Sequence, residues 1–374
     1  MKAFNTSLKE RLSSFDPLLL IFTAVLSTMS LLTLYGIRDA PGVSIGNFRM
    51  QLAASAVGLI LSLVISGIDY ETIVNRLWIP IIVIEIAVLA LTLIFGTAEG
   101  ANKSWLFIGK FGIQPSEFAK LSYIITFSKH IDIVGKRINR PLPLLTLVAH
   151  AGIVIGLILL SGDLGVGLVF IGLTAIMLYG AGLNLLYFAA AAGAAVLAFP
   201  YVWPHLREDQ QLRIIYGFNP EGDPLGKGMQ PLLGRSCISN GGLFGQGLNG
   251  GEYYRRLYAC ENDFAFSSLC EKFGVAAGIL TVLLLAALIV RVFYVGFKSR
   301  KKTGSLICVG IAGMLMIQTL ENIGMCLARL PVIGVTLPFI SYGGSSVTSA
   351  YLMIGFVHSI WAHRVKYFHE REER

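Results

Sequence analysis

The chain has 374 residues, of which 55% are apolar and only 14% charged, and its mean hydropathy is +0.69. So much apolar surface excludes an ordinary soluble protein and indicates a polytopic membrane protein. The formal net charge of +8 superficially suits a nucleic-acid-binding protein. In a membrane protein, however, basic residues more often report topology, so we expect no nucleic acid among the partners.

Apolar stretches of membrane length occur ten times. Because a helix that crosses the bilayer needs about 20 apolar residues, the sequence predicts spans at 17–35, 48–68, 78–96, 117–131, 142–161, 164–182, 184–203, 273–295, 304–325 and 342–362. The first lacks a small-residue cleavage pattern after it and is expected to be retained. The fourth is too short to cross without tilt or local thinning. The expected fold is one all-α polytopic membrane domain over residues 1–374.

Lysine and arginine are distributed unevenly between alternate connections. With a cytoplasmic N-terminus, the inner segments hold Lys2, Lys9, Arg11, Arg76, Lys129, Lys136, Arg137, Arg140, Lys298, Arg300, Lys301, Lys302, Arg364, Lys366, Arg371 and Arg374. The short outer connections hold only Arg38, Lys103, Lys110 and Arg329. The positive-inside rule then predicts that both termini are cytoplasmic. The run 298–302 is expected to contact anionic membrane lipids.

One long polar insert, residues 204–272 between the seventh and eighth spans, interrupts the apolar pattern, and this topology places it outside the membrane. A loop of this length is usually functional or disordered. Its run Gly241–Gly247 lacks the Gly-Lys-Ser/Thr ending of a phosphate loop and is interpreted as a tight turn. The five cysteines show no metal-binding spacing and are interpreted as small apolar residues, with a Cys260–Cys270 bridge left open.

Polar residues from five other parts of the chain reach the same outer face as this loop. Such convergence favours a functional site over any one residue taken alone. The candidates for binding substrate or organising the site are Arg49, Lys103, Trp105, Glu117, Lys120, Asp163, Arg255, Glu321, Asn322, Ser341, Gly343, Gly344 and Ser345.

Several ionisable groups allow two interpretations. Glu117 and Lys120 share a helix face and either neutralise each other or contact a substrate. Asp163 is either a helix N-cap or a site residue. Arg255, next to Arg256, either binds a diphosphate or is simply solvated.

Asp263 is the strongest candidate in the insert. The apolar residues 264–266 that follow it are expected to raise the pKa of its carboxyl group towards the range of a base. The alternative is an N-cap on a helix leading into the eighth span.

Two ionisable residues inside predicted spans stand apart from this outer face. His150 is interpreted as a satisfied interior histidine rather than a proton relay. Glu85 has no evident role.

These motifs resemble those of the SEDS family (shape, elongation, division and sporulation), which includes RodA, FtsW and SpoVE. The similarity covers nearly the whole chain and runs in the family's order through 101–105, 114–117 with Lys120, 163–165, 219–226, 241–245, 263–264, 322–325 and 338–346. Where two acidic residues are frequent in the family, this chain has Glu271 and Lys272.

The resemblance implies a ten-span fold and a peptidoglycan glycosyltransferase that polymerises lipid II at the outer face of the bacterial cytoplasmic membrane. It also implies a class B penicillin-binding protein as partner. The family's essential loop aspartate falls on Asp263, and its polar pair in the fourth span falls on Glu117 and Lys120.

The expected reaction inverts the donor sugar, with Asp263 as the base. Arg49, Lys103, Lys120 and Arg255 are candidates to stabilise the leaving diphosphate, with a divalent cation, Mg²⁺ or Mn²⁺, as a further possibility. The lipid tails are expected to lie between helices, in a groove opened by the short fourth span. A lipid II transporter and a non-catalytic scaffold for a transpeptidase remain as alternatives.

Overall fold

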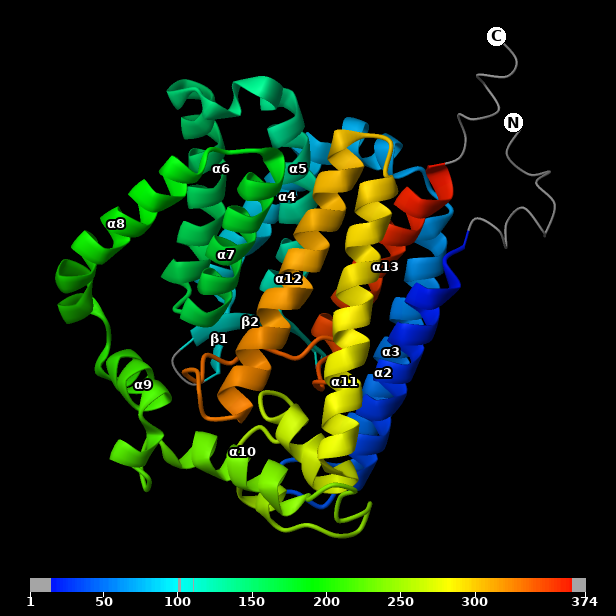
Figure 1. The fold of residues 1–374 in the computed structure, drawn as a ribbon, viewed down its shortest axis with the longest axis vertical. Helices are drawn as coiled ribbons and strands as arrows, with labels where there is room; N and C mark the ends of the chain where they lie inside the picture. The colour runs from blue at the N-terminus through cyan, green and yellow to red at the C-terminus, as the bar shows by residue number, and fades with distance from the viewer. Residues whose placement is uncertain (1–14, 100–101, 110, 365–374) are drawn as a thin grey trace.

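The computed structural model describes residues 15–99, 102–109 and 111–364. Six basic residues of the terminal segments and Lys110 belong to the charge pattern above but lie outside these ranges; the six are Lys2, Lys9, Arg11, Lys366, Arg371 and Arg374. Each predicted span corresponds to one long helix (Figure 1): α2 Pro17–Gly36, α3 Ile45–Ser66, α4 Tyr70–Phe95, α5 Pro115–Val134, α6 Pro141–Leu160, α7 Leu164–Ala181, α8 Leu185–Val202, α11 Ala265–Lys298, α12 Lys302–Cys326 and α13 Gly344–His363. The multi-pass fold is confirmed.

Local sequence explains where several of these helices begin. Asp16, Asp69 and Asn184 each accept a hydrogen bond from the backbone N–H two residues later, which satisfies a donor that the first helical turn leaves free. Proline occupies the first helical position of α2, α5 and α6, where its missing N–H costs nothing.

Two of the ten helices, α5 and α13, lie inside the bundle. Within the described residues, eight helices are long and apolar enough to be recognised as spans, and these two are not among them. Most residues of both are buried against neighbouring helices, so their polar side chains meet protein instead of lipid. With 20 residues, α5 is about 30 Å long. The prediction that the fourth span is too short is therefore wrong.

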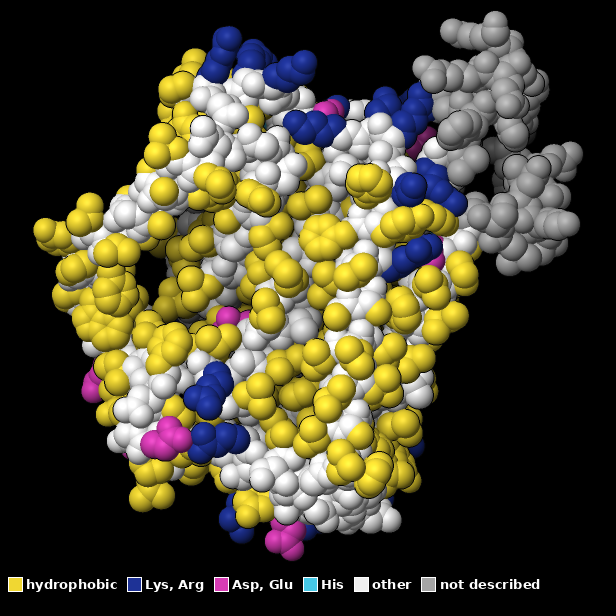
Figure 2. Space-filling view, viewed as in Figure 1, with side chains coloured by type: hydrophobic (Ala, Val, Ile, Leu, Met, Phe, Trp, Pro, Cys, Tyr) yellow, Lys and Arg dark blue, Asp and Glu magenta, His cyan; other side chains and the backbone are white. Residues whose placement is uncertain are grey.

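The helix α8 stands apart from the bundle (Figures 1 and 2), and none of its residues is buried. Its first turn is held by Asn139, which accepts from the Asn184 N–H and donates to the Gly182 carbonyl. In Figure 2 an opening lies between α8 and the other helices. Helix α5 is mostly buried among other helices, so the opening seen in Figure 2 lies beside α8 and not beside the fourth span; a lipid groove at the fourth span stays a prediction.

A small antiparallel sheet, which the sequence did not predict, follows α4. Strand β2 Asn102–Ile108 pairs with β1 Thr97–Glu99 on one side and with β3 Phe111–Ile113 on the other. The Lys103 N–H donates to the Ser161 carbonyl at the end of α6, at 3.0 Å. The sheet is thereby joined to the α6–α7 connection.

The polar insert is folded. It contains the 3-10 turns η2 Trp203–His205, η3 Pro220–Gly222 and η4 Tyr253–Arg256, and the helices α9 Glu208–Phe218 and α10 Met229–Asn240. We call the end of the bundle beside α9 and α10 the loop end; the described chain begins and finishes at the opposite end (Figure 1). Helix α11 starts at Ala265, so the last residues of the predicted insert are already helical. The left-handed Gly274 (φ 83°) breaks α11 near the predicted start of the span.

Glu271 anchors the second half of the insert. Its carboxylate is fully buried and accepts hydrogen bonds from Asn240 Nδ2 and from the backbone N–H groups of Glu252, Tyr253 and Tyr254, at 2.8–3.0 Å. The predicted turn at Gly241–Gly247 packs on the same part of α11, where Gly245 approaches the Lys272 carbonyl too closely for any side chain.

Replacing Glu271 with Ala is expected to destabilise the insert by about 3 kcal/mol or more, because several buried donors lose a charged acceptor together. Thermal unfolding and protease cleavage within the insert measure the effect. Glu252→Ala is the matched control, since that side chain is exposed and its backbone N–H remains. Equal stability of the two variants would contradict the anchoring role.

All five cysteines are buried free thiols. This fits their interpretation as small apolar residues, and the structure contains no Cys260–Cys270 bridge.

Candidate active site

Asp263 lies at the end of the insert, two residues before α11, with a partly buried side chain. Burial raises the pKa of Asp263 to about 6; the negative charge of Glu261 adds to this rise and Arg213 opposes it. Helix α11 begins after Phe264 without a side-chain cap, so the N-cap interpretation of Asp263 is wrong. A carboxyl group with this pKa exchanges its proton near neutral pH, as a general base must.

The backbone around Asp263 is fixed by two side chains that the sequence predicted for the site. The buried Asn322 of α12 donates from Nδ2 to the carbonyls of Asp263 (2.9 Å) and Val335 (2.8 Å). Ser341 donates from Oγ to the Asn262 carbonyl at 2.6 Å. Because these bonds use main-chain atoms, they orient Asp263 without occupying its carboxylate.

Gln51 of α3, which sequence reasoning missed, holds the turn that carries Ser341. It is fully buried, accepts from the Gly343 N–H at 3.1 Å and donates to the Ser341 carbonyl at 3.1 Å. A lone amide in the apolar stretch 51–66 was the available signal, since an amide at that depth needs partners. Arg49, selected instead, is exposed on the same helix.

Asp163 has the predicted N-cap role and a second contact. Its carboxylate accepts from the Val166 N–H at 3.0 Å and from Ser104 Oγ at 3.3 Å. Burial raises the pKa of Asp163. Ser104 was missed between its selected neighbours: Lys103 is exposed, and Trp105 packs beside Phe107.

Glu117 and Lys120 form the predicted pair on α5, with Nζ and Oε1 2.7 Å apart and both side chains buried. Helix α13 fastens this segment, because Ser349 Oγ donates to the Glu117 carbonyl at 2.6 Å and Ser345 Oγ accepts from the Gln114 N–H at 3.2 Å. Gly344 opens α13 beside these contacts.

Electrostatic interactions join these groups into one site. Asp163 lies within electrostatic range of the Glu117–Lys120 pair on one side and of Asp263 on the other. The structure therefore brings together side chains from α5, the start of α7, the end of the insert, α12 and the turn before α13. The selected Glu321 is partly buried on α12, next to Asn322.

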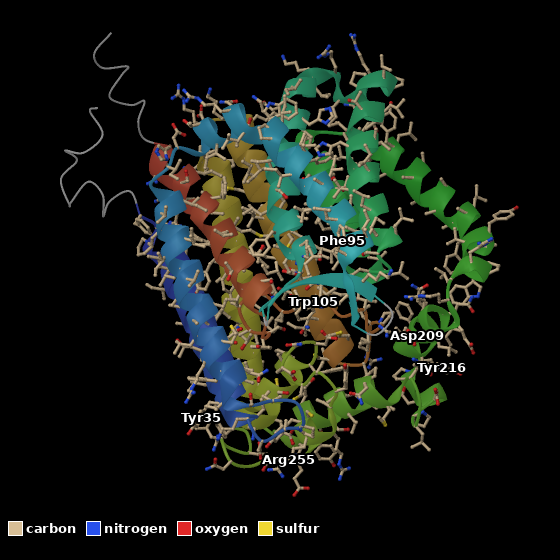
Figure 3. The ribbon with its side chains drawn as sticks, turned by 180° about the vertical axis from the view of Figure 1, so that it is seen from behind. Tyr35, Phe95, Trp105, Asp209, Tyr216 and Arg255 are labelled. Carbon is tan, nitrogen blue, oxygen red and sulfur yellow. The ribbon has the colours of Figure 1, made fainter. Side chains whose placement is uncertain are left out.

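Arg255 is placed elsewhere. Its guanidinium pairs with Asp39 at 2.6 Å, and Tyr254 donates to the same carboxylate at 2.7 Å. These contacts tie η4 to the connection between α2 and α3. Figure 3 shows Arg255 near the loop end, well away from Trp105 on the sheet.

A cation that the sequence did not single out interacts with Asp263. Arg213 of α9 is exposed and pairs with Asp209 at 2.9 Å, and its charge acts on the Asp263 carboxyl group. Asp209 also pairs with Lys227. Among the described residues, no three metal-binding side chains form a cluster.

The fold and this group of residues define a class of protein: a multi-pass membrane protein with a carboxylate-centred site at one end of its bundle. The model of the cell cycle protein family of FtsW, RodA and SpoVE matches residues 14–366, and the chain belongs to this family.

Relatives and solved structures agree. The chain is 34% identical to stage V sporulation protein E of Bacillus subtilis, covering 91% of this chain and 95% of that one. It is 30% identical to peptidoglycan glycosyltransferase MrdB of Escherichia coli, covering 93% and 94%.

Among solved structures, a chain reported under structural coordination of polymerization and crosslinking by a peptidoglycan synthase complex superposes with a TM-score of 0.81 at 26% identity, covering 94% and 99%. The rod shape determining protein RodA of Thermus thermophilus shares the fold, with a TM-score of 0.70 at 23% identity over 94% and 98% of the chains.

Proposed function

We infer that this protein is a peptidoglycan glycosyltransferase that polymerises lipid II into β-1,4-linked glycan strands. Asp263 carries the inference, because a carboxyl group with a pKa of about 6 is held in place by Asn322 and Ser341 in a family whose named relatives are glycosyltransferases. Cell shape, division and sporulation are the processes in which such relatives are named.

The proposed reaction is a single displacement at the anomeric carbon of the donor sugar. The acceptor oxygen forms a bond to the anomeric carbon while the bond from that carbon to the diphosphate oxygen breaks, which turns an α-linked donor into a β-linked product. Asp263 takes the proton that the acceptor hydroxyl loses. Glu117, Lys120 and Asp163 orient the site through their mutual interactions.

The leaving diphosphate needs positive charge. Of the cations named from the sequence, Lys120 is already paired with Glu117 and Arg255 with Asp39, which leaves Arg49 and Lys103 exposed. Arg213 has the strongest support: it also pairs with a carboxylate, Asp209, at the surface, but it is the cation whose charge acts on Asp263. We assign it to the diphosphate.

Arg213→Ala is expected to lower kcat/KM about 100-fold through loss of this charge, with partial recovery in Arg213→Lys. The measurement is polymer formed from lipid II at several substrate concentrations. Arg235→Ala is the control, because Arg235 is an equally exposed arginine paired with Glu221. Equal rates for the Arg213→Ala and Arg235→Ala variants would contradict the assignment.

The polymerisation rate is expected to depend on pH through Asp263. Only the deprotonated carboxylate accepts a proton, so kcat/KM stays level above the pKa of about 6. Below it, kcat/KM falls about tenfold per pH unit. A profile in lipid II and detergent, with thermal unfolding recorded at each pH, checks this; a level profile through about pH 5 would contradict it.

A divalent cation belongs to the same proposal. The described residues contain no group of three metal-binding side chains, so Mg²⁺ or Mn²⁺ would take ligands from the substrate diphosphate with a carboxylate such as Asp163. When bound, such an ion neutralises charge on the leaving group.

Orientation and partner complete the proposal. We place the loop end outside the bacterial cytoplasmic membrane and both termini in the cytoplasm, because Lys136, Arg137 and Arg140 belong to the connection between α5 and α6, which lies at the end opposite to the loop end (Figure 1). Lipid II enters from the bilayer through the opening beside α8.

A class B penicillin-binding protein is the proposed partner, supported by the similarity to a chain of a peptidoglycan synthase complex.

The alternatives are separated by liposomes that carry fluorescent lipid II and the purified protein, with and without that partner. A glycosyltransferase forms glycan chains. A transporter moves intact lipid II between leaflets, and a scaffold does neither. Translocation without polymer, with the partner present, would contradict the proposed function.

A further inference from the structure

Helix α9 of the insert has an apolar edge that the rest of the described chain leaves exposed. Ile215 and Phe218 lie three positions apart, and therefore on one face of the helix, with exposed fractions of 47% and 64%. The ion pair of Asp209 and Arg213 lies on the opposite face, because 3.6 residues make one turn. A helix with one apolar and one charged edge is typical of a boundary between water and an apolar phase.

The start of α9 is held at the end of a membrane span. The apolar span that contains α8 runs from Leu185 to His205, and α9 begins three residues later, at Glu208. Gln211, in the first turn of α9, donates to the Trp203 carbonyl at 2.8 Å. Three residues reach about 10 Å at most. This end of α9 therefore stays close to the level at which the span ends.

The other end of α9 is held at the same level through a second span. Gly217, in the last turn, lies so close to the connection between α12 and α13 that an added Cβ would be 2.3 Å from Pro331 Cα. Two residues later in that connection, the Ile333 carbonyl packs against Gly165, where an added Cβ would be 2.1 Å from its oxygen. Gly165 is the second residue of α7. Because α7 and α8 are consecutive spans, α7 starts on the side of the membrane where α8 ends, so α9 lies along this boundary.

The end of α8 has the composition of a membrane boundary. Tyr201, which is 78% exposed, and the partly buried Trp203 lie in the last turn of the span, and such rings favour the headgroup level of a bilayer. No residue of α8 is buried, so its exposed apolar surface leads directly to α9. Figure 1 shows α9 next to the end of α8, at the margin of the bundle.

We propose that α9 binds the lipid surface at the loop end, with Ile215 and Phe218 inserted between the headgroups and the upper part of the acyl chains. The contact is hydrophobic, because Arg207 and Arg213 are balanced in number by Glu208 and Asp209. It is therefore expected to form on neutral lipids and to persist in high salt, which screens exposed charges.

The lipid contact has a consequence for catalysis, which rests on the proposed function. The charge of Arg213, on the face opposite to the apolar edge, acts on Asp263. The diphosphate of a lipid-linked substrate lies at headgroup depth, so a helix fixed at this level holds Arg213 within reach of the leaving group. The lipid contact itself does not depend on this role.

Fluorescence quenching by lipids tests the contact. The five native cysteines are at most 1% exposed, so a cysteine introduced at the surface of the full-length protein can be labelled selectively with a fluorophore. The protein is placed in liposomes of phosphatidylcholine that carry a nitroxide quencher near the top of the acyl chain. The label in Phe218→Cys is expected to be quenched about twofold more than the label in Asp209→Cys, on the opposite face. Ile215→Cys is a second position on the apolar edge and should behave like Phe218→Cys.

Two results would overturn the proposal. One is equal quenching of the labels on the two faces of α9. The other is a label at residue 218 that lipids do not quench but that the proposed partner protein shields, since this would assign the apolar edge to a protein interface. The experiment uses no lipid II, so its outcome is independent of the proposed function.

The consequence for Arg213 has its own test. Phe218→Ser is expected to lower kcat/KM for lipid II in liposomes about tenfold, because the arginine is displaced from the reacting diphosphate. Tyr258→Ser, which removes another exposed aromatic side chain of the insert, is the control. Equal rates for these two folded variants would exclude the role of α9 in positioning Arg213.

Discussion

Asp263→Asn is expected to lower lipid II polymerisation by at least about 100-fold while the protein stays folded. The amide keeps the size of the side chain but cannot take up the proton that the acceptor sugar hydroxyl loses. A general base commonly accelerates a reaction by about 100-fold or more. Asn322 and Ser341 bind main-chain atoms around residue 263, so the local backbone should not move.

The measurement is glycan formed by each variant with the proposed partner present, alongside its unfolding temperature. Glu261→Gln is the closest control. Glu261 lies two residues from Asp263, and the effect of its negative charge there is to raise the pKa of Asp263. A small loss is expected there. Wild-type activity in folded Asp263→Asn would show that another group is the base.

Lys120→Ala is expected to destabilise the protein by about 3–5 kcal/mol, because it leaves the Glu117 carboxylate buried without its ion pair. The double variant Lys120→Met, Glu117→Gln removes both charges and should recover most of that stability. Thermal unfolding in one detergent measures both effects.

Activity of the double variant then separates the two interpretations of the pair. We expect the double variant to polymerise lipid II more slowly than the wild type, because Asp163 has lost the neighbouring charges that act on it. A stable double variant with wild-type activity would show that the pair only neutralises itself.

The apolar pattern predicted all ten helices because hydrophobic length is a local property of the chain. The pattern underestimated the length of α5. A helix surrounded by protein can carry Glu117, Lys120 and several hydroxyl groups, so its apolar run is shorter than the helix itself. The strands of the sheet at 97–113 pair with one another, but they and the insert helices α9 and α10 are too short to leave a long apolar run in the sequence.

Within the site, residues with unusual local chemistry were found and those with distant partners were not. The Glu117–Lys120 pair and the Asp163 cap follow from spacing within one helix. Gln51 is identified by contacts to residues about 290 positions away. The role of Arg213 likewise appears only when α9 is placed beside Asp263.

The most direct test of the central claim is a time course with purified wild-type protein, its proposed partner and lipid II in detergent, where there are no leaflets between which to transport lipid. We predict muramidase-sensitive glycan chains that lengthen with time, even when the partner's transpeptidase is blocked. Intact lipid II at every time point, with both proteins folded and bound to each other, would contradict the account.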